Sequence, residues 1–501
     1  MNQEKIKTQK VQKVVIAGGG SAGWMVAAAL TKLLGKNLQI SLIESEEIGR
    51  IGVGEATIPP LRVFNQLLGI NDQEFMSSCQ ATFKLGIEFK NWGQNGDSYI
   101  HSFGETGKIC WAGEFQHFWL AGKNKGRPEK FGDYCVELKA AEAGKFGHTK
   151  ESQLNYAYHL DAGLYAEFLK KFAIKHGLKR IEGVITDVTT NPHSGFIETL
   201  KLADGQVING DLFIDCTGFA ARLIEGTLNT GFESYADLLP CDSAVAVQTE
   251  KFGEPRPYTQ SIAHDFGWQW RIPLQHRVGN GLVFCSRFGS DEQAIETLMS
   301  NLESKPITEP KVFKYNTGKR RKGWNKNCVA IGLASGFLEP VESTAIHLIM
   351  SAVLRLMRLF PHDEISQSNI DEYNRQYDNE MERIRDFIIL HYKATEREDT
   401  PFWSYCKQMD IPDTLAHRIK LFKDTARVCI TDTELFRIDS WTQVMIGQRI
   451  IPENYHQIVD MMSDEELNRF LSGLKNDVSK KVAQMPTHQE FINQYCKAQP
   501  I

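Results

Sequence analysis

The chain has 501 residues, of which 42% are hydrophobic and 24% are charged, and its formal net charge is -5. This length suggests about three folding units, at roughly 150 residues each. The balance of charge provides no basic field that would attract nucleic acid, so we expect no nucleic-acid partner. The ten cysteines form no CxxC pair and no zinc-type spacing, which indicates reduced thiols and no metal site.

The sequence also indicates where the protein works. No apolar run reaches the about 20 residues that a membrane span requires. The first thirteen residues are polar and basic, and the apolar core and cleavage site of a secretion signal are missing. We therefore expect a cytoplasmic protein without a membrane partner. The oligomeric state is left open, a homodimer included.

The first elements are predicted to form a β-α-β unit. Residues 13–17 are a compact apolar strand, residues 18–23 a glycine turn, and residues 24–34 an apolar helix rich in alanine. A second strand at residues 38–43 ends at Glu44. The segment 49–60 is too rich in glycine and proline for helix or strand, so it is predicted to be an ordered loop against a ligand.

The rest of the chain is predicted to be strand-rich and then helical. Residues 92–150 mix aromatics and glycine without periodicity, which predicts irregular and partly stranded structure. We expect a helix at 163–176, strands at 183–189, 197–202, 212–215, 245–249, 267–273 and 281–284, and strand, loop and helix at 328–350. After residue 361, apolar residues recur at helical steps, at Ile370, Tyr373, Tyr377, Met381, Ile384 and Ile388. The last third is therefore predicted to be mostly helical.

The glycine turn has the spacing of a dinucleotide-binding motif. Gly18, Gly20 and Gly23, with Ser21 and Ala22 between them, follow a strand and open a helix. Glycine there permits a tight turn, close approach to a pyrophosphate and close helix packing, and the helix N-terminus attracts the phosphates. Glu44 ends the next strand, where a carboxylate accepts hydrogen bonds from ribose hydroxyls. A glycine-rich turn without a ligand is the alternative.

This motif does not separate FAD from NAD. The strand that ends Asp215-Cys-Thr-Gly218 resembles the second cofactor segment of FAD-dependent hydroxylases, although an ordinary buried strand also fits. The sequence holds no second GxGxxG motif. A dedicated nicotinamide domain is thus missing, and a separate NAD(P)H-dependent flavin reductase would supply the reduced cofactor.

Three further segments carry a resemblance to a known family. Residues 267–273 contain the pattern W-x-W-x-I-P with Trp268 and Trp270, residues 83–87 surround Lys84, and residues 336–344 read GFLEPVEST. Together with the glycine motif and the IGVGEATIP loop, they resemble the flavin-dependent tryptophan halogenases, in the same order, from about residue 13 to about 350.

The resemblance implies a fold and a domain organisation. The fold class would be α/β (mixed α+β), with an FAD-binding dinucleotide fold of the aromatic-hydroxylase type, a strand-rich substrate region and a mostly helical C-terminal region. Residues 1–360 would form the FAD-binding module, with substrate-side insertions at about 92–160 and 235–320. Residues 361–501 would form a helical module that covers the substrate.

The resemblance also implies the cofactor, the cosubstrates and the residues that bind them. The cofactor would be FAD, used as FADH2, with O2 and a halide (chloride or bromide) as cosubstrates. The cofactor residues would be Gly18, Gly20, Ser21, Ala22, Gly23, Glu44, Arg50, Glu55, Ala56, Val184, Asp215, Gly218, Gly332, Phe337 and Leu338.

Lys84 and Glu342 would be the catalytic pair. In the family, hypohalous acid made at the flavin travels through an internal tunnel to the lysine, which hydrogen-bonds it or forms a haloamine. An amine on a flexible stem can do both. Glu342 would orient Lys84 and accept the ring proton. If the family resemblance is set aside, the alternative interpretation of Lys84 is a solvated surface lysine. The alternative for Glu342 is that it caps a helix together with Ser343 and Thr344.

The remaining roles are likewise implied by the resemblance. Backbone amides of Thr344 and Ala345 would bind the halide, although many family members carry glycine in place of Ala345. Trp268 and Trp270 point to one face of a strand and would line the tunnel, whereas spacing alone favours core packing. The substrate pocket would contain His101, Phe103, Pro340, Ser343 and Trp403.

The predicted substrate departs from free tryptophan. Family members that act on the free amino acid hold it with a tyrosine pair and a glutamate, and residues 427–438 contain no such pair. We expect the substrate to be an indole-type aromatic whose ring is held less firmly than free tryptophan is held by those family members. Two alternatives remain: an aromatic hydroxylase of the flavin monooxygenase class, and a non-enzymatic FAD-binding module or redox sensor.

Overall fold

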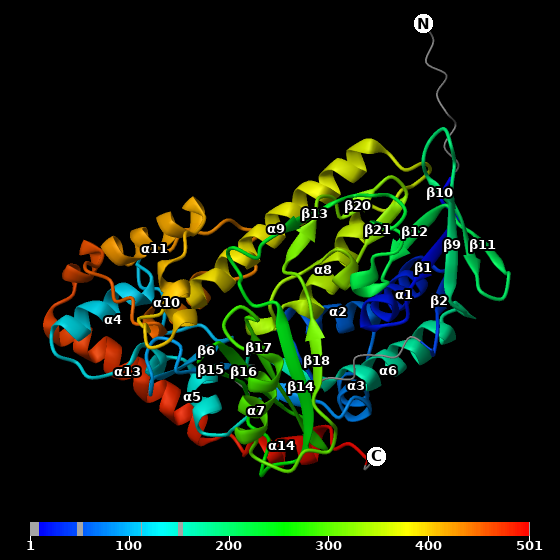
Figure 1. Cartoon of the computed structure of the whole chain (residues 1–501). Coiled ribbons are helices and arrows are strands. Elements are labelled where there is room, and N and C mark those ends of the chain that lie inside the picture. The colour runs from blue at the N-terminus through cyan, green and yellow to red at the C-terminus, as the bar shows by residue number, and fades with distance from the viewer. Residues whose placement is uncertain (1–9, 48–53, 112, 149–153, 500–501) are drawn as a thin grey trace, which may run out of the picture.

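The structure is a computed structural model, and it describes residues 10–47, 54–111, 113–148 and 154–499. A six-stranded sheet forms the N-terminal core in the order β20-β21-β12-β1-β2-β8. Its strands are β1 (Lys13–Ala17), β2 (Gln39–Glu44), β8 (Lys179–Glu182), β12 (Leu212–Asp215), β20 (Trp324–Asn325) and β21 (Cys328–Ala330). All neighbours are parallel except β20 and β21. The short apolar strands are buried because helices cover parallel sheets, here α1 (Ser21–Leu34) and α6 (Ala162–Lys175) at the right of Figure 1.

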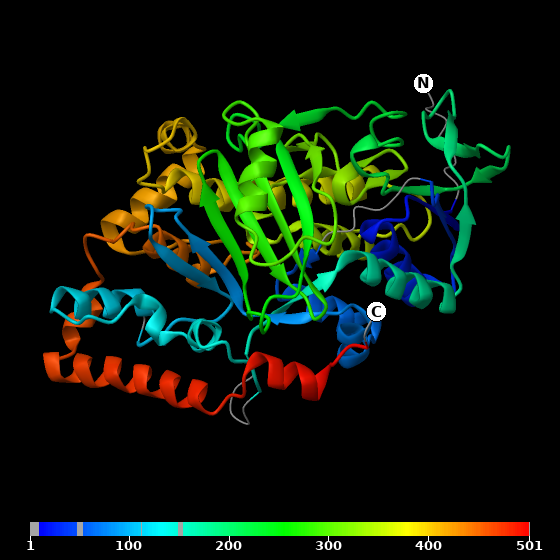
Figure 2. The same ribbon diagram turned by 60° about the horizontal axis from the view of Figure 1, so that its bottom comes forward.

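A seven-stranded sheet occupies the centre of the molecule, in the order β18-β14-β17-β16-β15-β5-β6. Its strands are β5 (Gly86–Lys90), β6 (Ser98–Ser102), β14 (Ser243–Glu250), β15 (Thr259–His264), β16 (Gly267–Pro273), β17 (Arg277–Phe284) and β18 (Lys311–Lys314). Only the β15–β5 pair is parallel. Figure 2 shows this sheet in front, with α7 (Asp291–Ser300) lying on it. Strands from early and late segments of the chain therefore share one sheet.

Three small sheets complete the strand content of the described chain. They are β3-β7-β4, from β3 (Gly54–Ala56), β4 (Thr82–Lys84) and β7 (Ala157–Asp161); β11-β10-β9, from β9 (Ile185–Thr190), β10 (Ile197–Leu202) and β11 (Val207–Asn209); and β13-β19-β22, from β13 (Phe232–Ser234), β19 (Gly318–Arg320) and β22 (Gly336–Phe337). The first of these sheets fixes the position of Lys84 at the end of β4.

Helices fill the other layers. They are α2 (Pro60–Leu68), α3 (Asp72–Ser78), α4 (Phe115–Asn124), α5 (Val136–Glu142), α8 (Ala345–Arg358), α9 (Gln367–Lys393), α10 (Pro401–Gln408), α11 (Asp413–Thr425), α12 (Ile438–Gly447), α13 (Asp464–Ala483) and α14 (His488–Tyr495), with 3-10 turns η1 (Phe131–Tyr134), η2 (Gly218–Ala220), η3 (Gly332–Ala334), η4 (Pro340–Glu342) and η5 (Gln457–Met461). The long helix α9 crosses the molecule diagonally, and α4 lies beside α13 in both views (Figures 1 and 2). None of the helices in the described part of the chain is long and apolar enough to span a bilayer.

Most predicted elements are confirmed. The β1-α1-β2 unit, the strand β12, the helix α6 and the helical last third all appear near their predicted bounds, and the fold is mixed α/β. The stripe that begins at Ile370 is buried along α9. The predicted domain boundary at residue 360 remains a prediction.

Two sequence-based predictions were wrong. Residues 92–150 contain α4, η1 and α5 besides the strand β6. The first eight residues of α4 are all buried, so this helix has no polar face and its sequence shows no helical period. In the predicted loop 49–60, Gly54–Ala56 form β3 and Pro60 begins α2, because β3 pairs with β7 despite its glycine. Residues 48–53 lie outside the described chain.

Candidate active site

A cavity of about 870 Å³ opens where the two large sheets meet. It is lined by the turn after β1, by the ends of β2 and β12, and by the η3-β22-η4 segment. Its lining includes most of the predicted cofactor residues: Gly18, Gly20, Ser21, Ala22, Glu44, Glu55, Ala56, Val184, Gly218, Gly332, Phe337 and Leu338. The same cavity also reaches Trp268, Trp270, Pro340, Ser343 and Ala345. The residues predicted to bind the cofactor and the residues predicted to line the tunnel therefore line the same cavity.

The three glycines of the motif have different physical roles. Gly18 has φ +111°, and a Cβ there would lie 2.2 Å from the Cys216 carbonyl oxygen. A Cβ on Gly23 would lie 1.9 Å from the carbonyl oxygen of Gly18, so this glycine lets α1 pack on the turn. A Cβ on Gly20 would meet nothing within 4 Å. Gly18 and Gly23 are therefore needed by the fold, whereas Gly20 faces the space in which a pyrophosphate would bind.

Two carboxylates line the nucleotide end of the cavity. Glu44 is buried and accepts a 2.6 Å hydrogen bond from Arg180 Nε, and Lys170 Nζ lies 3.4 Å from the same oxygen. Glu55 is partly exposed to the cavity, and its removal from bulk water raises its pKa to about 7. Arg50, the remaining predicted residue of this region, lies outside the described residues.

The carboxylate of Asp215 is bound within the protein. One oxygen accepts hydrogen bonds from the Thr217 amide (3.0 Å) and hydroxyl (2.7 Å). The other accepts from the amides of Leu223 and Ile224, both at 2.8 Å. These bonds shape the turn after β12, so that Gly218 lines the cavity. Through its side chain, Asp215 supports the turn, and its role toward a cofactor remains a prediction.

The two tryptophans of β16 form part of the cavity wall. Trp268 and Trp270 lie on the same face, as predicted, with ring centroids 6.2 Å apart. The Trp268 indole Nε1 donates a 2.9 Å hydrogen bond to the Tyr392 hydroxyl, which in turn donates to Glu339. Burial raises the pKa of Glu339 to about 7. This chain of bonds fixes the Trp268 ring against α9.

Lys84 is completely buried and does not itself line this cavity. Its Nζ donates to the Thr57 carbonyl oxygen (3.0 Å) and to the hydroxyl of Ser343 (2.8 Å), a residue that lines the cavity. The Phe103 ring centroid lies 5.2 Å from the same nitrogen. Burial lowers the pKa of Lys84 to about 7, against the opposing effect of the Glu342 carboxylate. At neutral pH both the ammonium and the nucleophilic amine are therefore populated.

The turn before α8 presents backbone amides to the same region. Ser343 adopts a left-handed conformation (φ 59°), which ends η4 and directs its hydroxyl to Lys84. Thr344 and Ala345 follow at the N-terminus of α8, where the first amides of a helix have no intrahelical partner. The Thr344 hydroxyl is buried and has no hydrogen-bond partner among the described residues. The start of α8 is thus a site of positive potential.

Glu342 is completely buried, and two histidines contact it. Nδ1 of His101 lies 3.0 and 2.9 Å from its two oxygens, and Nε2 of His391 lies 2.7 Å from Oε1. Burial alone would raise the pKa of Glu342, but the charge and hydrogen bonds of the histidines outweigh it and hold the pKa at about 2. Glu342 is therefore an ionised carboxylate close enough to influence Lys84.

The predicted pocket residues do not all come together. His101, Phe103 and Ser343 surround the pair of Lys84 and Glu342, and Pro340 lines the cavity. Trp403 instead packs in α10 against Trp92, Tyr392 and Phe402, and its Nε1 donates to the His264 carbonyl oxygen (2.7 Å).

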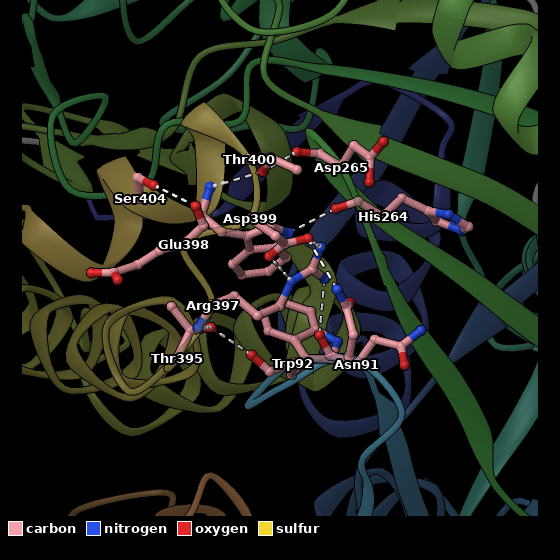
Figure 3. Close-up of polar contacts among 12 residues, drawn as sticks. Asn91, Trp92, His264, Asp265, Thr395, Arg397, Glu398, Asp399, Thr400 and Ser404 are labelled. Atoms are coloured by element: carbon pink, nitrogen blue, oxygen red, sulfur yellow. Dashed lines mark hydrogen bonds and ion pairs between the residues drawn. The ribbon is translucent and has the colours of Figure 1, made fainter.

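The loop before Trp403, residues 395–400, is hydrogen-bonded to segments next to the central sheet. Thr395 and Arg397 donate to the carbonyl oxygens of Trp92 and Asn91, and Thr400 donates to that of Asp265 (Figure 3). This anchoring buries Trp403 as a core residue in the present structure. Its role as a pocket wall remains a prediction.

Sequence reasoning missed His391, Phe387 and Phe436. The Phe436 ring stacks on that of Phe387 at 3.8 Å, and both rings lie within 6.2 Å of the His101 ring. A signal was available in the stripe of α9, because the step from Ile384 to Ile388 continues to His391 three residues later. Nothing in the sequence pairs this histidine with Glu342.

Comparisons with known proteins identify the family to which this chain is similar. A family model described as tryptophan halogenase matches residues 13–464. A solved flavin-dependent halogenase from Xanthomonas campestris is 52% identical, with a TM-score of 0.97 over 98% of this chain and 100% of that chain. BrvH, a flavin-dependent halogenase from Brevundimonas sp. BAL3, is 41% identical, with a TM-score of 0.93 over 97% and 99%. The tryptophan 6-halogenase SttH of Streptomyces toxytricini is 35% identical over 83% of this chain and 85% of its own length.

Proposed function

This chain belongs to the tryptophan halogenase family, and from that premise we propose that it is an FADH2-dependent enzyme that halogenates an indole-type aromatic through Lys84. The residues around the Gly18 turn would hold the FAD, which in its reduced form would supply, with O2 and a halide, the oxidising power for hypohalous acid. The chain's own residues then direct this oxidant and hold the ring. A separate flavin reductase delivers the FADH2, and the reaction takes place in the cytoplasm.

The observation that carries the proposal is the connection between the nucleotide site and Lys84. One cavity extends from the Gly18 turn to Ser343, and the Ser343 hydroxyl is hydrogen-bonded to Lys84. In the proposed mechanism, an oxidant formed at the nucleotide end passes along this cavity to Ser343 and from there to the amine, without entering bulk solvent. The fit of the cofactor is supported by Gly20, where a Cβ would meet no atom within 4 Å, so that a pyrophosphate has room beside the backbone.

A halide would bind at the start of α8. The amides of Thr344 and Ala345, the unpartnered Thr344 hydroxyl and the helix dipole all favour an anion there. Ala345 lines the cavity beside Ser343. A halide bound there would lie next to Ser343, whose hydroxyl contacts Lys84.

Lys84 would present the halogen to the ring, and Glu342 would accept the proton that the ring loses. With a pKa near 7, Lys84 can donate a hydrogen bond as the ammonium or react as the amine. The lowered pKa of Glu342, about 2, favours the ionised carboxylate, which would also stabilise the positive charge that develops on the attacked ring. Phe103 and His101 bound the space beside both groups.

The substrate would be an indole-type molecule other than free tryptophan. Residues 427–438 lack the tyrosine pair that clamps the amino acid in the family. Glu434, the glutamate of this stretch, accepts two hydrogen bonds from Arg418, at 2.9 and 3.0 Å. A carboxylate held in this way is not free to bind a substrate amino group. The relative SttH is a tryptophan 6-halogenase, so the two substrate classes must be compared directly.

The test is a halogenation assay with the full chain, FAD, a flavin reductase, NADH, bromide and a panel of indoles that includes tryptophan. We expect a brominated product, recognised in the mass spectrum by the bromine isotope pair, with indole or substituted indoles converted faster than tryptophan. An added oxygen without bromine would favour a hydroxylase instead. Fast turnover of tryptophan at one ring position would contradict the substrate assignment.

A further inference from the structure

Glu55 is a carboxyl group in the cavity wall to which the mechanism proposed above gives no chemical task. It is the middle residue of β3. Its neighbours Gly54 and Ala56 face Ile272 of β16, since a Cβ on Gly54 would lie 3.4 Å from that side chain and Ala56 packs in the same cluster. Because side chains alternate along a strand, Glu55 points to the other side of β3, where it lines the cavity.

The carboxyl group of Glu55 has no hydrogen-bond or ion-pair partner in the described part of the chain. Its removal from bulk water raises the pKa to about 7, and no neighbouring charge contributes to that rise. At neutral pH both the acid and the carboxylate are therefore populated. The acid form holds a proton that it can release into the cavity without breaking a contact within the protein.

The ionisable groups on the strands packed against β3 are engaged elsewhere. β3 contacts β7, β16 and β17, which carry the ionisable residues Tyr158, His159, Asp161, Arg271 and Arg277. Asp161 accepts a 2.6 Å hydrogen bond from Arg277, and Arg271 lies 3.1 Å from Glu303. The histidine and the tyrosine form hydrogen bonds of their own. The strands around β3 thus bring no base that would take the proton of Glu55.

The other ionisable groups in the cavity wall are poorly suited to release a proton at neutral pH. In the described chain they are Glu44, Cys216, Arg222, Lys314 and Tyr315. Glu44 and Lys314 are held in ion pairs, and an arginine such as Arg222 does not lose its proton. Burial raises the pKa of the Cys216 thiol and of the Tyr315 hydroxyl well above their ordinary values, so both keep their protons.

The proposed reaction consumes a proton where the oxidant forms. FADH2, O2, a halide ion and one proton give FAD, hypohalous acid and water. FADH2 and the halide each lose two electrons, and O2 accepts all four as its O–O bond breaks. One oxygen becomes bonded to the halogen, and the other takes the proton and leaves as water. We propose that Glu55 is the acid that delivers this proton at the nucleotide end of the cavity.

The proposal rests on the proposed function, since it gives Glu55 a step in the formation of the oxidant. The resulting carboxylate takes up a proton from solvent before the next turnover. Without an acid, FADH2 and O2 still give FAD and hydrogen peroxide, a reaction that consumes no further proton. Loss of the Glu55 carboxyl group therefore diverts the reaction from hypohalous acid to hydrogen peroxide and leaves the oxidation of FADH2 in place.

The first experiment compares Glu55→Gln with Glu55→Asp and with the control Glu88→Gln, all in a Lys84→Met parent. Lys84→Met removes a second group with a pKa of about 7 and leaves the oxidant to a scavenger. Glu88 is partly buried, as Glu55 is, but it does not line the cavity. At saturating FADH2 and bromide, Glu55→Gln should lower the ratio of oxidised scavenger to hydrogen peroxide at least about tenfold. Glu88→Gln should match the parent, and Glu55→Asp, which keeps an acid, should lie between them.

The pH dependence of the same ratio gives a second readout. Glu55 is protonated below about pH 7, so the ratio in the parent should fall as the pH rises through about 7. In Glu55→Gln it should be low and constant over this range. An unchanged ratio in Glu55→Gln, an equal loss in Glu88→Gln or a basic limb that persists in Glu55→Gln would each overturn the proposal. Absence of oxidised scavenger from the parent and of brominated product from the wild type would instead count against the proposed function.

A third measurement requires neither FAD nor turnover. Infrared difference spectra of the full apoprotein between about pH 6 and about pH 8 record the carbonyl band of protonated carboxyl groups, which ordinary glutamates do not show in this range. Part of this band should titrate with a midpoint of about 7, and that part should be missing from Glu55→Gln and present in Glu88→Gln. Identical spectra of the wild type and Glu55→Gln would mean that Glu55 holds no proton at neutral pH and cannot be the acid.

Discussion

At the scale of single residues, the burial of Lys84 costs free energy of folding. Nothing in the flanking sequence requires a lysine inside the protein, and an amine removed from water loses hydration free energy that two hydrogen bonds only partly replace. The family resemblance supplied the residue, while its environment, with Thr57, Ser343 and Phe103 as neighbours, came from the fold. A destabilising group retained in this way is typical of functional sites.

Replacing Lys84 should therefore separate stability from activity. We expect Lys84→Met to stabilise the fold by about 3–5 kcal/mol at neutral pH, because a buried, partly charged amine is replaced by an apolar chain of similar length. Bromination should fall at least about 100-fold while flavin oxidation continues. Thermal unfolding and product analysis check both outcomes. Lys90→Met on β5, a partly exposed lysine, is the control and should change neither.

The stabilisation should also depend on pH. The pKa of Lys84 is about 7 in the folded chain and near 10.5 in the unfolded chain. Between these values the unfolded state binds more protons, so the penalty of burying Lys84 decreases as the pH rises. The advantage of Lys84→Met should be largest below about pH 7 and should vanish toward about pH 10.5. An advantage that is constant with pH would show that Lys84 keeps an ordinary pKa.

At the scale of elements, the turn between β1 and α1 distinguishes folding from binding. Gly18 and Gly23 are needed because backbone atoms occupy the space of a side chain, whereas Gly20 faces open space. The sequence motif treats the three glycines alike, and only the folded structure separates them. The same holds for Asp215, which the motif assigns to the cofactor and the structure shows bonded within its own turn.

Two substitutions test this distinction. Gly20→Ala should leave the melting temperature unchanged and weaken FAD binding by roughly tenfold or more, because its methyl group occupies the pyrophosphate approach. Gly18→Ala should destabilise the apoprotein by more than about 2 kcal/mol, since it combines a clash with a left-handed φ. Thermal unfolding without FAD and a flavin titration measure the two effects. If Gly18→Ala and Gly20→Ala had the same effects on stability and on FAD binding, the separation of a folding role for Gly18 from a binding role for Gly20 would be wrong.

At the scale of the whole molecule, sequence reasoning predicted the dinucleotide fold and the tryptophan strand. It did so because glycine turns, alternating strands and short motifs are local signals. It failed for α4, whose buried faces carry no period, and for the His391–Glu342 pair, whose members are joined only when α9 packs across the turn before α8. Contacts between distant elements depend on packing that no local pattern records.

The central claim is that the oxidant moves inside the protein from the nucleotide end of the cavity to Lys84. The most direct measurement adds a fast scavenger of hypohalous acid to the bromination assay and follows product and scavenger oxidation together. We expect the wild type to give the same yield of brominated product at every scavenger concentration, and Lys84→Met to oxidise the scavenger instead. A wild-type yield that falls in proportion to the scavenger would mean that the oxidant passes through solvent, and the internal route would be wrong.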